Sequence, residues 1–246
     1  MITLFGKEEA NVILSSLRDV VFGYEDEPVI EHLSLDIHFG QFIGIAGPNG
    51  AAKSTLLKLI LGLLKPWSGT VQFAREREDG LNIAIGYVPQ QVSSFNAGFP
   101  SKVIELVRSG CYTRLGLFRR FNSRENAIVE RSLKEVDMWE YRNRKIGELS
   151  GGQKQRICIA RALAQEPEVL ILDEPATGMD LASRTGLYEL LNHYVRQHGR
   201  TVIMVTHALE ETSPYLDTRI NLERKENEGW QCLVTNLCSA HFGLGV

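Results

Sequence analysis

Long apolar runs are missing from this chain of 246 residues. Its richest apolar stretch, residues 55–64, contains Lys58 and is well below the ~20 residues that a membrane-spanning helix requires. Residues 1–10 carry Lys7, Glu8 and Glu9 and no apolar segment, so we expect no secretory signal peptide. If the protein works at a membrane, we expect other chains to supply the membrane spans.

Cysteine and net charge are low as well. The four cysteines form no Cys-x-x-Cys pair, which predicts reduced thiols in a reducing compartment. The formal net charge of -3 argues against a dedicated nucleic-acid binder. No internal repeat or low-complexity linker divides the chain, and a hydrophobic fraction of 43% with 23% charged residues indicates a soluble globular protein.

Short apolar segments predict strands in both halves of the chain, at residues 13–22, 29–37, 41–46, 70–73, 83–88, 169–172 and 201–205. Helical patterns cover residues 53–64 and 154–164, and residues 101–141 are mostly helical around a basic aromatic segment, 114–121. Two strand-rich parts that enclose a helical insert predict an α/β core with an inserted all-helical lobe.

A phosphate-binding pattern, close to Gly-x-x-x-x-Gly-Lys-Ser, lies between the strand at 41–46 and the helix after it. In such a loop, successive backbone N–H groups and a helix N-terminus face an anion, here a triphosphate. Lys53 adds a positive charge near the β- and γ-phosphates, and the Ser54 hydroxyl can ligate Mg²⁺. The nucleotide-binding residues predicted here are Gly47, Pro48, Asn49, Gly50, Ala51, Ala52, Lys53, Ser54 and Thr55.

Ala52 departs from this pattern, because glycine is expected directly before the lysine. An extra methyl group then stands where the backbone must approach phosphate. We expect a negative φ at Ala52, since alanine costs little in that conformation. The alternative for the whole segment is a glycine-rich turn between strand and helix that binds no ligand.

Two adjacent carboxylates, Asp173 and Glu174, end the apolar strand at 169–172. A strand buried on both faces tolerates charge only at its C-terminal end, where the ligand sites of α/β proteins lie. We expect Asp173 to hold Mg²⁺, mostly through water. Glu174 is expected to accept the proton of the attacking water, a role worth roughly 10²–10⁴-fold in rate. Taken alone, an acidic turn after a strand is the alternative.

A second candidate anion site precedes the helix at 154–164 and consists of Leu149, Ser150, Gly151, Gly152 and Gln153. Ser150 is a predicted N-cap, and the two glycines leave the helix end open to an anion. A capped helix after a loop is the simpler alternative, but a cap needs only one small polar residue. Since one active site rarely needs two phosphate-facing helix N-termini, we expect this one to face the γ-phosphate bound by another subunit.

These motifs, in this order, resemble the nucleotide-binding subunits of ATP-binding cassette (ABC) transporters over roughly residues 11–225, and residues 149–153 match the family signature. The resemblance implies further roles. Tyr24 stacks on adenine, Gln90 is the Q-loop glutamine, and Asp180 is the D-loop aspartate. His207 is the switch histidine near the γ-phosphate.

Each of these four residues has a simpler alternative when it is taken alone. Tyr24 is then a packing residue, Gln90 a surface amide, Asp180 a helix N-cap and His207 a histidine at a strand end. Their position relative to the other motifs favours the functional roles. Ala208 stands where the family often has aspartate, and we expect no loss of activity from this difference.

The resemblance also implies the fold and its divisions. It is that of an ABC nucleotide-binding domain, a P-loop NTPase core of mixed sheet and flanking helices with an antiparallel β part and an inserted all-helical lobe. The core is expected at residues 11–90 and 161–225, the lobe at about 91–160, and a short C-terminal tail at 226–246.

The implied activity is ATP hydrolysis coupled to transport, with ATP and Mg²⁺ bound. The catalytic residues are expected to be Glu174, His207, Gln90 and Lys53, and the Mg²⁺ ligands Ser54, Gln90 and Asp173. The implied partners are a second copy in an ATP-sandwich dimer, a polytopic membrane permease and, indirectly, an extracytoplasmic metal-binding protein, without nucleic acid. The expected location is the cytoplasmic face of the cell membrane.

Residues 90–100, Ser109-Gly110 and residues 118–120 are most similar to ATPase subunits of bacterial zinc and manganese uptake, some of which also carry alanine at the place of Ala52. The resemblance therefore implies import of a divalent metal ion, zinc first and manganese or iron second. The basic residues Arg114, Arg119 and Arg120 are expected either in the part that receives a helix of the membrane subunit or in a solvated charged loop.

Three further possibilities remain at this point. Cys232, Cys238 and His241 have a spacing compatible with Zn²⁺, but without a fourth ligand ordinary thiols are the simpler explanation. An ABC-type ATPase that acts on DNA or ribosomes would carry long coiled coils or two cassettes, and this sequence has neither. A regulatory ATP sensor without turnover is supported by Ala52 alone, because such a sensor would not need the base Glu174.

Overall fold

A computed structural model describes residues 12–77, 80–90, 100–115, 121–224 and 230–236 and divides them into two compact units. The first unit contains the described residues up to 83 and from 194 onward, and the second unit contains residues 84–193. Within these described ranges, no helix combines the length and hydrophobicity needed to cross a membrane.

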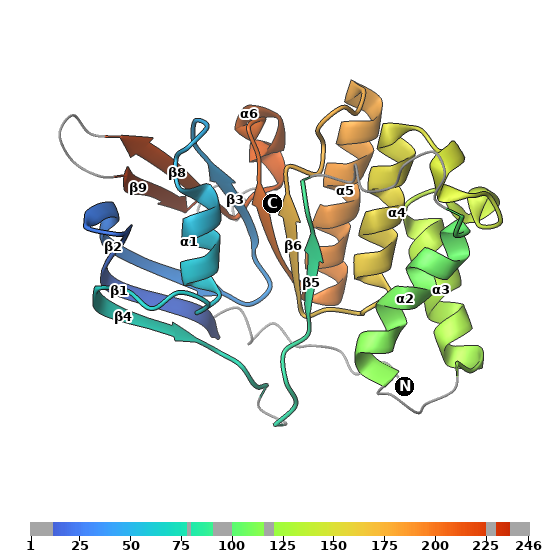
Figure 1. The fold of residues 1–246 in the computed structure, drawn as a ribbon, viewed down its shortest axis with the longest axis horizontal. Helices are drawn as coiled ribbons and strands as arrows, with labels where there is room; N and C mark the ends of the chain where they lie inside the picture. The colour runs from blue at the N-terminus through green and yellow to red at the C-terminus, as the bar shows by residue number, and fades with distance from the viewer. Residues whose placement is uncertain (1–11, 78–79, 91–99, 116–120, 225–229, 237–246) are drawn as a thin grey trace, which may run out of the picture. The chain divides into compact units, whose positions relative to one another are not determined.

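The first unit is built on a sheet with the strand order β4-β1-β2-β9-β8-β3-β7. β1 pairs antiparallel with β2 and with β4, whereas β3 pairs in parallel with β7 and β8. This is the predicted combination of a mixed sheet with an antiparallel part (Figure 1). The strands are β1 (Ile13–Tyr24), β2 (Glu27–His38), β3 (Phe42–Ala46), β4 (Ser68–Phe73), β7 (Thr201–Val205), β8 (Thr218–Arg224) and β9 (Trp230–Asn236).

Burial explains why the strands next to the nucleotide loop have uninterrupted apolar sequences. Every residue of β3 and of β7 is buried. A strand covered on both faces cannot alternate polar and apolar residues, so its sequence reads as a continuous apolar run. β2 has one covered face, and its residues alternate between buried and more exposed from Leu33 to His38.

Helix α1 (Lys53–Ile60) packs on this sheet through Leu56, Leu57, Leu59 and Ile60. It is shorter than the predicted 53–64, because Gly62 has a φ of 63° that ends the helix. The hydroxyl of the buried Ser15 on β1 donates to the Ile60 carbonyl at 2.6 Å and satisfies a terminal acceptor of α1. The sheet thereby fixes the helix that begins at the nucleotide loop. The short helix α6 (Leu209–Thr212) and the 3₁₀ turn Ser213–Tyr215 also belong to this unit.

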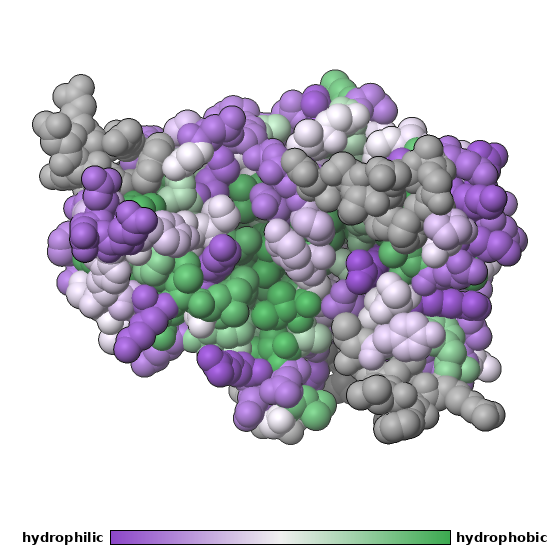
Figure 2. Space-filling view, viewed as in Figure 1, coloured by the Kyte–Doolittle hydropathy of each residue, from purple (hydrophilic) through white to green (hydrophobic). Residues whose placement is uncertain are grey.

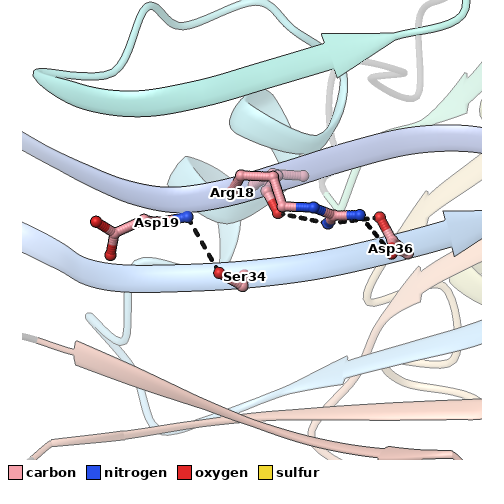
Figure 3. A network of polar contacts seen from close by, with 5 residues as sticks. Arg18, Asp19, Ser34 and Asp36 are labelled. Carbon is pink, nitrogen blue, oxygen red and sulfur yellow. Dashed lines mark hydrogen bonds and ion pairs between the residues drawn. The ribbon is translucent and has the colours of Figure 1, made fainter.

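Polar contacts join β1 and β2 along the exposed side of the antiparallel part (Figure 3). Arg18 donates to Asp36 Oδ1 at 2.7 Å and to Oδ2 at 2.8 Å, and the Asp19 amide donates to Ser34 Oγ at 3.0 Å. The Arg18 guanidinium lowers the pKa of the Asp36 carboxyl below its ordinary value, chiefly through these hydrogen bonds. The contacts follow a register shift between Leu17 and Val20 and hold the two strands together there.

The second unit combines two parallel strands, β5 (Ile85–Val88) and β6 (Val169–Asp173), with helices α2 (Val103–Leu115), α3 (Ser123–Glu135) and α4 (Gly151–Leu163). Short 3₁₀ turns lie at Trp139–Tyr141 and Ile146–Glu148. Helix α5 (Leu181–His198) begins in the second unit and ends in the first. α2 and α4 meet closely at Gly110, where a Cβ atom would lie 2.2 Å from the Arg161 carbonyl oxygen.

The exposed surface of α3 carries polar side chains, some of which form a capping box and ion pairs. Asn122 and Glu125 form a capping box at its start. Arg131 pairs with Glu166 at 2.7 Å, and hydrophilic residues prevail over this helix in Figure 2. Exposed ion pairs of this kind add little to the free energy of unfolding, so we attribute the placement of α3 to its buried residues.

Candidate functional site

The predicted phosphate-binding loop lies in the first unit, between the buried end of β3 and the first residue of α1. A Cβ atom on Gly47 would lie 2.9 Å from Ala51 Cβ and 3.0 Å from the Leu222 carbonyl oxygen, so only glycine fits there. Gly50 has a φ of 79°, a conformation that glycine adopts without strain. Residues 48–50 are exposed, and the loop therefore presents its backbone to solvent at the N-terminus of α1.

The expectation of a negative φ at Ala52 is wrong. Ala52 precedes α1 with a φ of 55° and a ψ of 21°, in the left-handed region that favours glycine. A turn that alternates right- and left-handed residues points successive N–H groups into one concave site, which explains why the loop imposes this conformation. Alanine thus bears backbone strain at the position where the pattern has glycine.

Lys53 and Tyr24 are both connected to this loop and its helix. Lys53 Nζ donates to the carbonyl oxygens of Gly47, at 2.9 Å, and of Pro48, at 3.0 Å. The Tyr24 hydroxyl lies 3.1 Å from Oγ1 of the buried Thr55. The Tyr24 ring is half exposed and lies edge to face with Phe22, so part of the ring is accessible to a flat ligand.

His207 shares the sheet edge of the loop. β3 and β7 are parallel, with Ile45 opposite Val205. Gly47 follows the end of β3 and His207 follows the end of β7, so both leave the first unit's sheet at the same edge. The Thr206 amide donates to the Ile45 carbonyl at 3.0 Å and ties the two strand ends together. His207 is exposed at this edge.

The predicted carboxylates lie in the second unit, at the end of β6. Asp173 is the last residue of that strand and is half-buried, like Glu174 after it. Gln90 follows β5, the parallel neighbour of β6, and its Nε2 donates to Glu174 Oε2 at 2.6 Å. The structure thus brings together the predicted Q-loop glutamine and the predicted catalytic base. Tyr87 faces the same end of the strands, and burial, with a smaller effect of the Asp173 charge, raises its pKa.

The signature segment forms the N-terminus of α4, as the sequence predicts for Ser150. The Ser150 hydroxyl accepts from the Gln153 amide at 3.3 Å, and the Ser150 amide donates to Gln153 Oε1 at 3.0 Å, which makes a capping box. The helix starts at Gly151, three residues before the predicted start. A Cβ atom on Gly151 would meet nothing within 4 Å, so the helix end is open to a neighbouring group.

Asp180 lies beside the signature segment in one open pocket of about 400 Å³. The pocket is lined by Ser150, Gly151, Gly152 and Gln153 from the start of α4 and by Asp180 and Ser183 from the start of α5. Leu149 is buried behind it. Two of the predicted binding segments, distant in sequence, therefore form one surface of the second unit.

Some residues of this pocket were not predicted from the sequence. Asp137, Met138, Tyr141, Arg156, Gly178, Met179 and Ser183 complete its lining. Only Ser183 has a recognisable signal, since a serine three residues after an aspartate at a helix start is a capping pattern. Arg156 comes from α4, and the others come from turns whose approach depends on tertiary packing.

The predicted binding residues have the chemistry to bind a nucleoside triphosphate with Mg²⁺. The loop offers N–H donors and one lysine for phosphate oxygens, and the Ser54 hydroxyl, the Asp173 carboxylate and the Gln90 amide are oxygen donors of the kind that Mg²⁺ prefers. Ser54 is exposed at the start of α1 and Asp173 lies at a strand end, where charge is tolerated.

Several predicted features fall outside the described residues. These are residues 91–99 and 118–120, Arg119 and Arg120, Cys238 and His241. Cys232 lies in β9, which starts inside the segment predicted as a tail. Among the described residues, no cluster of three or more histidine, cysteine, aspartate or glutamate side chains could hold a metal ion. The described Cys111 and Cys158 form no disulfide.

The fold and the nucleotide loop between β3 and α1 are those of a P-loop ATPase. A family model described as "ABC transporter" matches residues 30–177. The high-affinity zinc uptake system ATP-binding protein ZnuC of Bacillus subtilis is 56% identical over 93% of this chain and 99% of its own length. The zinc transport system ATP-binding protein AdcC of Streptococcus pneumoniae is 47% identical over 88% and 93%. A manganese transport system ATP-binding protein, MntB of Halalkalibacterium halodurans, is 42% identical over 82% and 80%.

Solved structures agree with these relatives. A metal-chelate type ABC transporter in an inward-facing conformation matches with a TM-score of 0.75 and 28% identity, over 91% of this chain and 83% of its own. The dimeric ATP-binding cassette MJ0796 bound to ADP and Pi matches with a TM-score of 0.69 and 29% identity, over 86% and 97%. The chain belongs to the ABC transporter family and is an ATPase of that family.

Proposed function

We propose that this protein is the ATP-hydrolysing motor subunit of a bacterial importer that takes up a divalent metal ion, zinc. The identity of 56% to a zinc-uptake ATPase over nearly the whole of both chains supports zinc. Manganese is the second candidate, because the manganese-transport relative is less similar, at 42%. We further propose a polytopic permease and an extracytoplasmic metal-binding protein as partners, with this chain at the cytoplasmic face of the membrane.

The hydrolysis site is proposed to form between two copies of the chain. In each copy, Tyr24 and the loop from Gly47 to Thr55 bind adenine and phosphates, with Mg²⁺ held by Ser54, Gln90 and Asp173. Glu174 accepts the proton of the attacking water, and His207 contacts the γ-phosphate. The lobe at about 91–160 is proposed to pass closure of the dimer to the permease.

One observation carries the two-copy arrangement. The signature residues 150–153 and Asp180 line a single open pocket of the second unit, and the phosphate-binding loop belongs to the first. Helix α4 begins with two glycines, and the space around Gly151 is free. Such a helix N-terminus suits the γ-phosphate of a second copy.

The test uses Glu174→Gln protein, in which ATP persists, with or without Gly151→Asp. Aspartate fits sterically at Gly151 but places a carboxylate against the partner's γ-phosphate. We expect Glu174→Gln to dimerise with ATP in analytical ultracentrifugation, and Gly151→Asp to block dimerisation while the monomer still binds ATP. Gly186→Asp is the matched control, because Gly186 also has no atom within 4 Å of its Cβ position. Normal ATP-driven dimerisation of Gly151→Asp would defeat the proposal.

For the metal, zinc-limited growth of a deletion strain complemented with Lys53→Ala or wild-type protein is the direct experiment. We expect only the wild-type chain to restore uptake of labelled zinc. Restored uptake of manganese but not zinc would replace zinc by the second candidate.

A further inference from the structure

The Asp180 carboxylate is held at the start of its own helix. Its Oδ1 accepts from the Ser183 amide at 2.9 Å, and its Oδ2 accepts from the Ser183 hydroxyl at 3.0 Å. The Asp180 carbonyl accepts from the Arg184 amide at 3.0 Å and begins the hydrogen bonding of α5. Asp180 therefore has the contacts of an N-cap residue, and Ser183 engages both of its carboxylate oxygens.

The segment before Asp180 depends on this anchor. Between Glu174 and Asp180 the chain makes two turns, with the Thr177 amide bonded to the Glu174 carbonyl at 3.3 Å and the Met179 amide to the Ala176 carbonyl at 3.1 Å. Gly178, within the second turn, has a φ of 77° and no atom within 4 Å of its Cβ position. An unpacked glycine restricts the backbone little, so the direction of the chain beyond it must be fixed by the next contacts.

Those contacts connect the segment to the signature helix. Met179 is buried, and its Cγ lies 3.9 Å from the position that a Cβ of Gly152 would take. Asp180 and Ser183 line the same pocket as Ser150 and Gly151. Within the second unit, the cap of α5 thus sets how Met179 and Asp180 meet the start of α4.

We infer that Ser183 is a positioning residue for ATP-driven dimer closure, because its hydroxyl and amide hold Asp180 against the signature pocket. Ser183 acts through Asp180 and contacts no nucleotide of its own protomer in this arrangement. The inference rests on the proposed two-copy site, since it concerns the surface that the second copy would meet.

The protonation behaviour of Asp180 supports the same arrangement. Hydrogen bonds from the Ser183 amide, and then from its hydroxyl, lower the pKa of the Asp180 carboxyl below its ordinary value, although the group is exposed. A residue that only packed against the helix would leave this pKa unchanged. The pKa therefore reports the contact independently of dimerisation.

The experiment compares Ser183→Ala, Ser183→Val and Ser183→Thr in the Glu174→Gln background. Valine and threonine have the same shape, so that pair differs only in the hydroxyl. We expect Ala and Val to raise the dissociation constant of the ATP-bound dimer about five- to tenfold, the usual net effect of one intramolecular hydrogen bond. Threonine should stay within about twofold of serine, and ATP affinity of the monomer should not change in any variant.

Thr185→Ala is the control for general weakening of α5. Its hydroxyl donates to the Leu181 carbonyl at 3.1 Å on the same helix, but it does not line the pocket. NMR titration of Asp180 should show a higher pKa in Ser183→Ala than in the parent and no change in Thr185→Ala.

The outcomes separate this inference from the proposed function. If the Glu174→Gln parent binds ATP but does not dimerise, the two-copy site fails. If the parent dimerises and Ser183→Val dimerises as well as Ser183→Thr, the role of Ser183 is overturned. An equal loss in Thr185→Ala and Ser183→Ala also overturns it, because the effect would then come from the helix as a whole.

Discussion

Gln90 Nε2 donates a hydrogen bond of 2.6 Å to Glu174 Oε2. Glu174 also has a φ of 47°, directly after the apolar strand β6. A non-glycine residue in this conformation costs on the order of 1–3 kcal/mol and persists only where surrounding structure enforces it, most often at functional sites. The strained backbone and the amide contact fix one orientation of the carboxylate, as a base that must meet a single water requires.

Glu174→Gln should lower the turnover number for ATP by roughly 10²–10⁴-fold, since the amide keeps the shape but cannot accept the proton. ATP affinity should change by less than about threefold, because the phosphate contacts come from the loop at 47–54. Phosphate release and equilibrium ATP binding measure the two quantities. Glu140→Gln, at a strongly exposed carboxylate, is the control. Wild-type turnover in Glu174→Gln would falsify the assignment of the base.

Ala52→Gly should raise the free energy of unfolding by about 0.5–1 kcal/mol. Glycine relieves the left-handed strain at a φ of 55°, and this gain exceeds the entropy that glycine adds to the unfolded chain. Chemical denaturation measures the difference. Ala51→Gly is the matched control with the opposite sign, because Ala51 is buried and has no positive φ. A loss of stability in both variants would show that the strain at Ala52 is negligible.

Tyr24→Ala should weaken ATP binding about tenfold, since stacking of a base on an aromatic ring contributes roughly 1–3 kcal/mol. Tyr24→Phe keeps the ring and loses only the contact with Thr55, so it should stay within about threefold of wild type. Titration with a fluorescent ATP analogue measures both. Tyr112→Ala, at another exposed aromatic, should have no effect. Equal losses in the alanine and phenylalanine variants would assign the role to the hydroxyl instead of the ring.

The sequence predicts best the strands that are buried on both faces, because such strands must have an uninterrupted apolar sequence. β7 occupies the predicted residues 201–205, and β3 and β6 differ from prediction by one residue, because both faces of these strands are covered. Neither β8 nor β9 is predicted from the sequence. β9 pairs antiparallel with β8 from Thr218 opposite Asn236 to Arg224 opposite Trp230, and in parallel with β2 only at Ile30 and Trp230, 200 residues apart in the chain. The early start of α4 is also missed, because glycine disfavours helix and only the capping box initiates it there.

The features of the candidate site also fall into two groups, those that the sequence predicts and those that only the structure shows. Residues with a motif, such as Lys53 and Ser150, are found from spacing, since phosphate binding requires a particular backbone turn. The φ of Ala52 is set by the loop between β3 and α1 and cannot be read from composition, which is why the sequence-based expectation fails. Met179 lies beside Gly152 at the start of α4, although the two are far apart in sequence, and only the folded second unit reveals this.

A buried aspartate anchors the strand that leads into the nucleotide loop. Asp217 Oδ2 accepts from the Phe42 amide at 2.8 Å, and Oδ1 accepts from Arg196 at 2.6 Å, while the Asp217 side chain is 8% exposed. Phe42 is the first residue of β3 and is fully buried. Without Asp217, the buried Phe42 amide loses its acceptor in a region where water has little access, whereas the Arg196 side chain is 45% exposed and can turn to water.

Asp217→Ala should therefore lower the free energy of unfolding by about 1–3 kcal/mol, as expected when a buried amide is left without its acceptor. Asp217→Asn keeps an acceptor for Phe42 and nearly the same volume, so it should lose less than half as much. Urea denaturation measures both values, and Glu140→Ala, at a glutamate that is 85% exposed, should stay within about 0.5 kcal/mol of wild type. If alanine and asparagine are equally destabilising, the charge pair with Arg196 rather than the Phe42 amide anchors the start of β3.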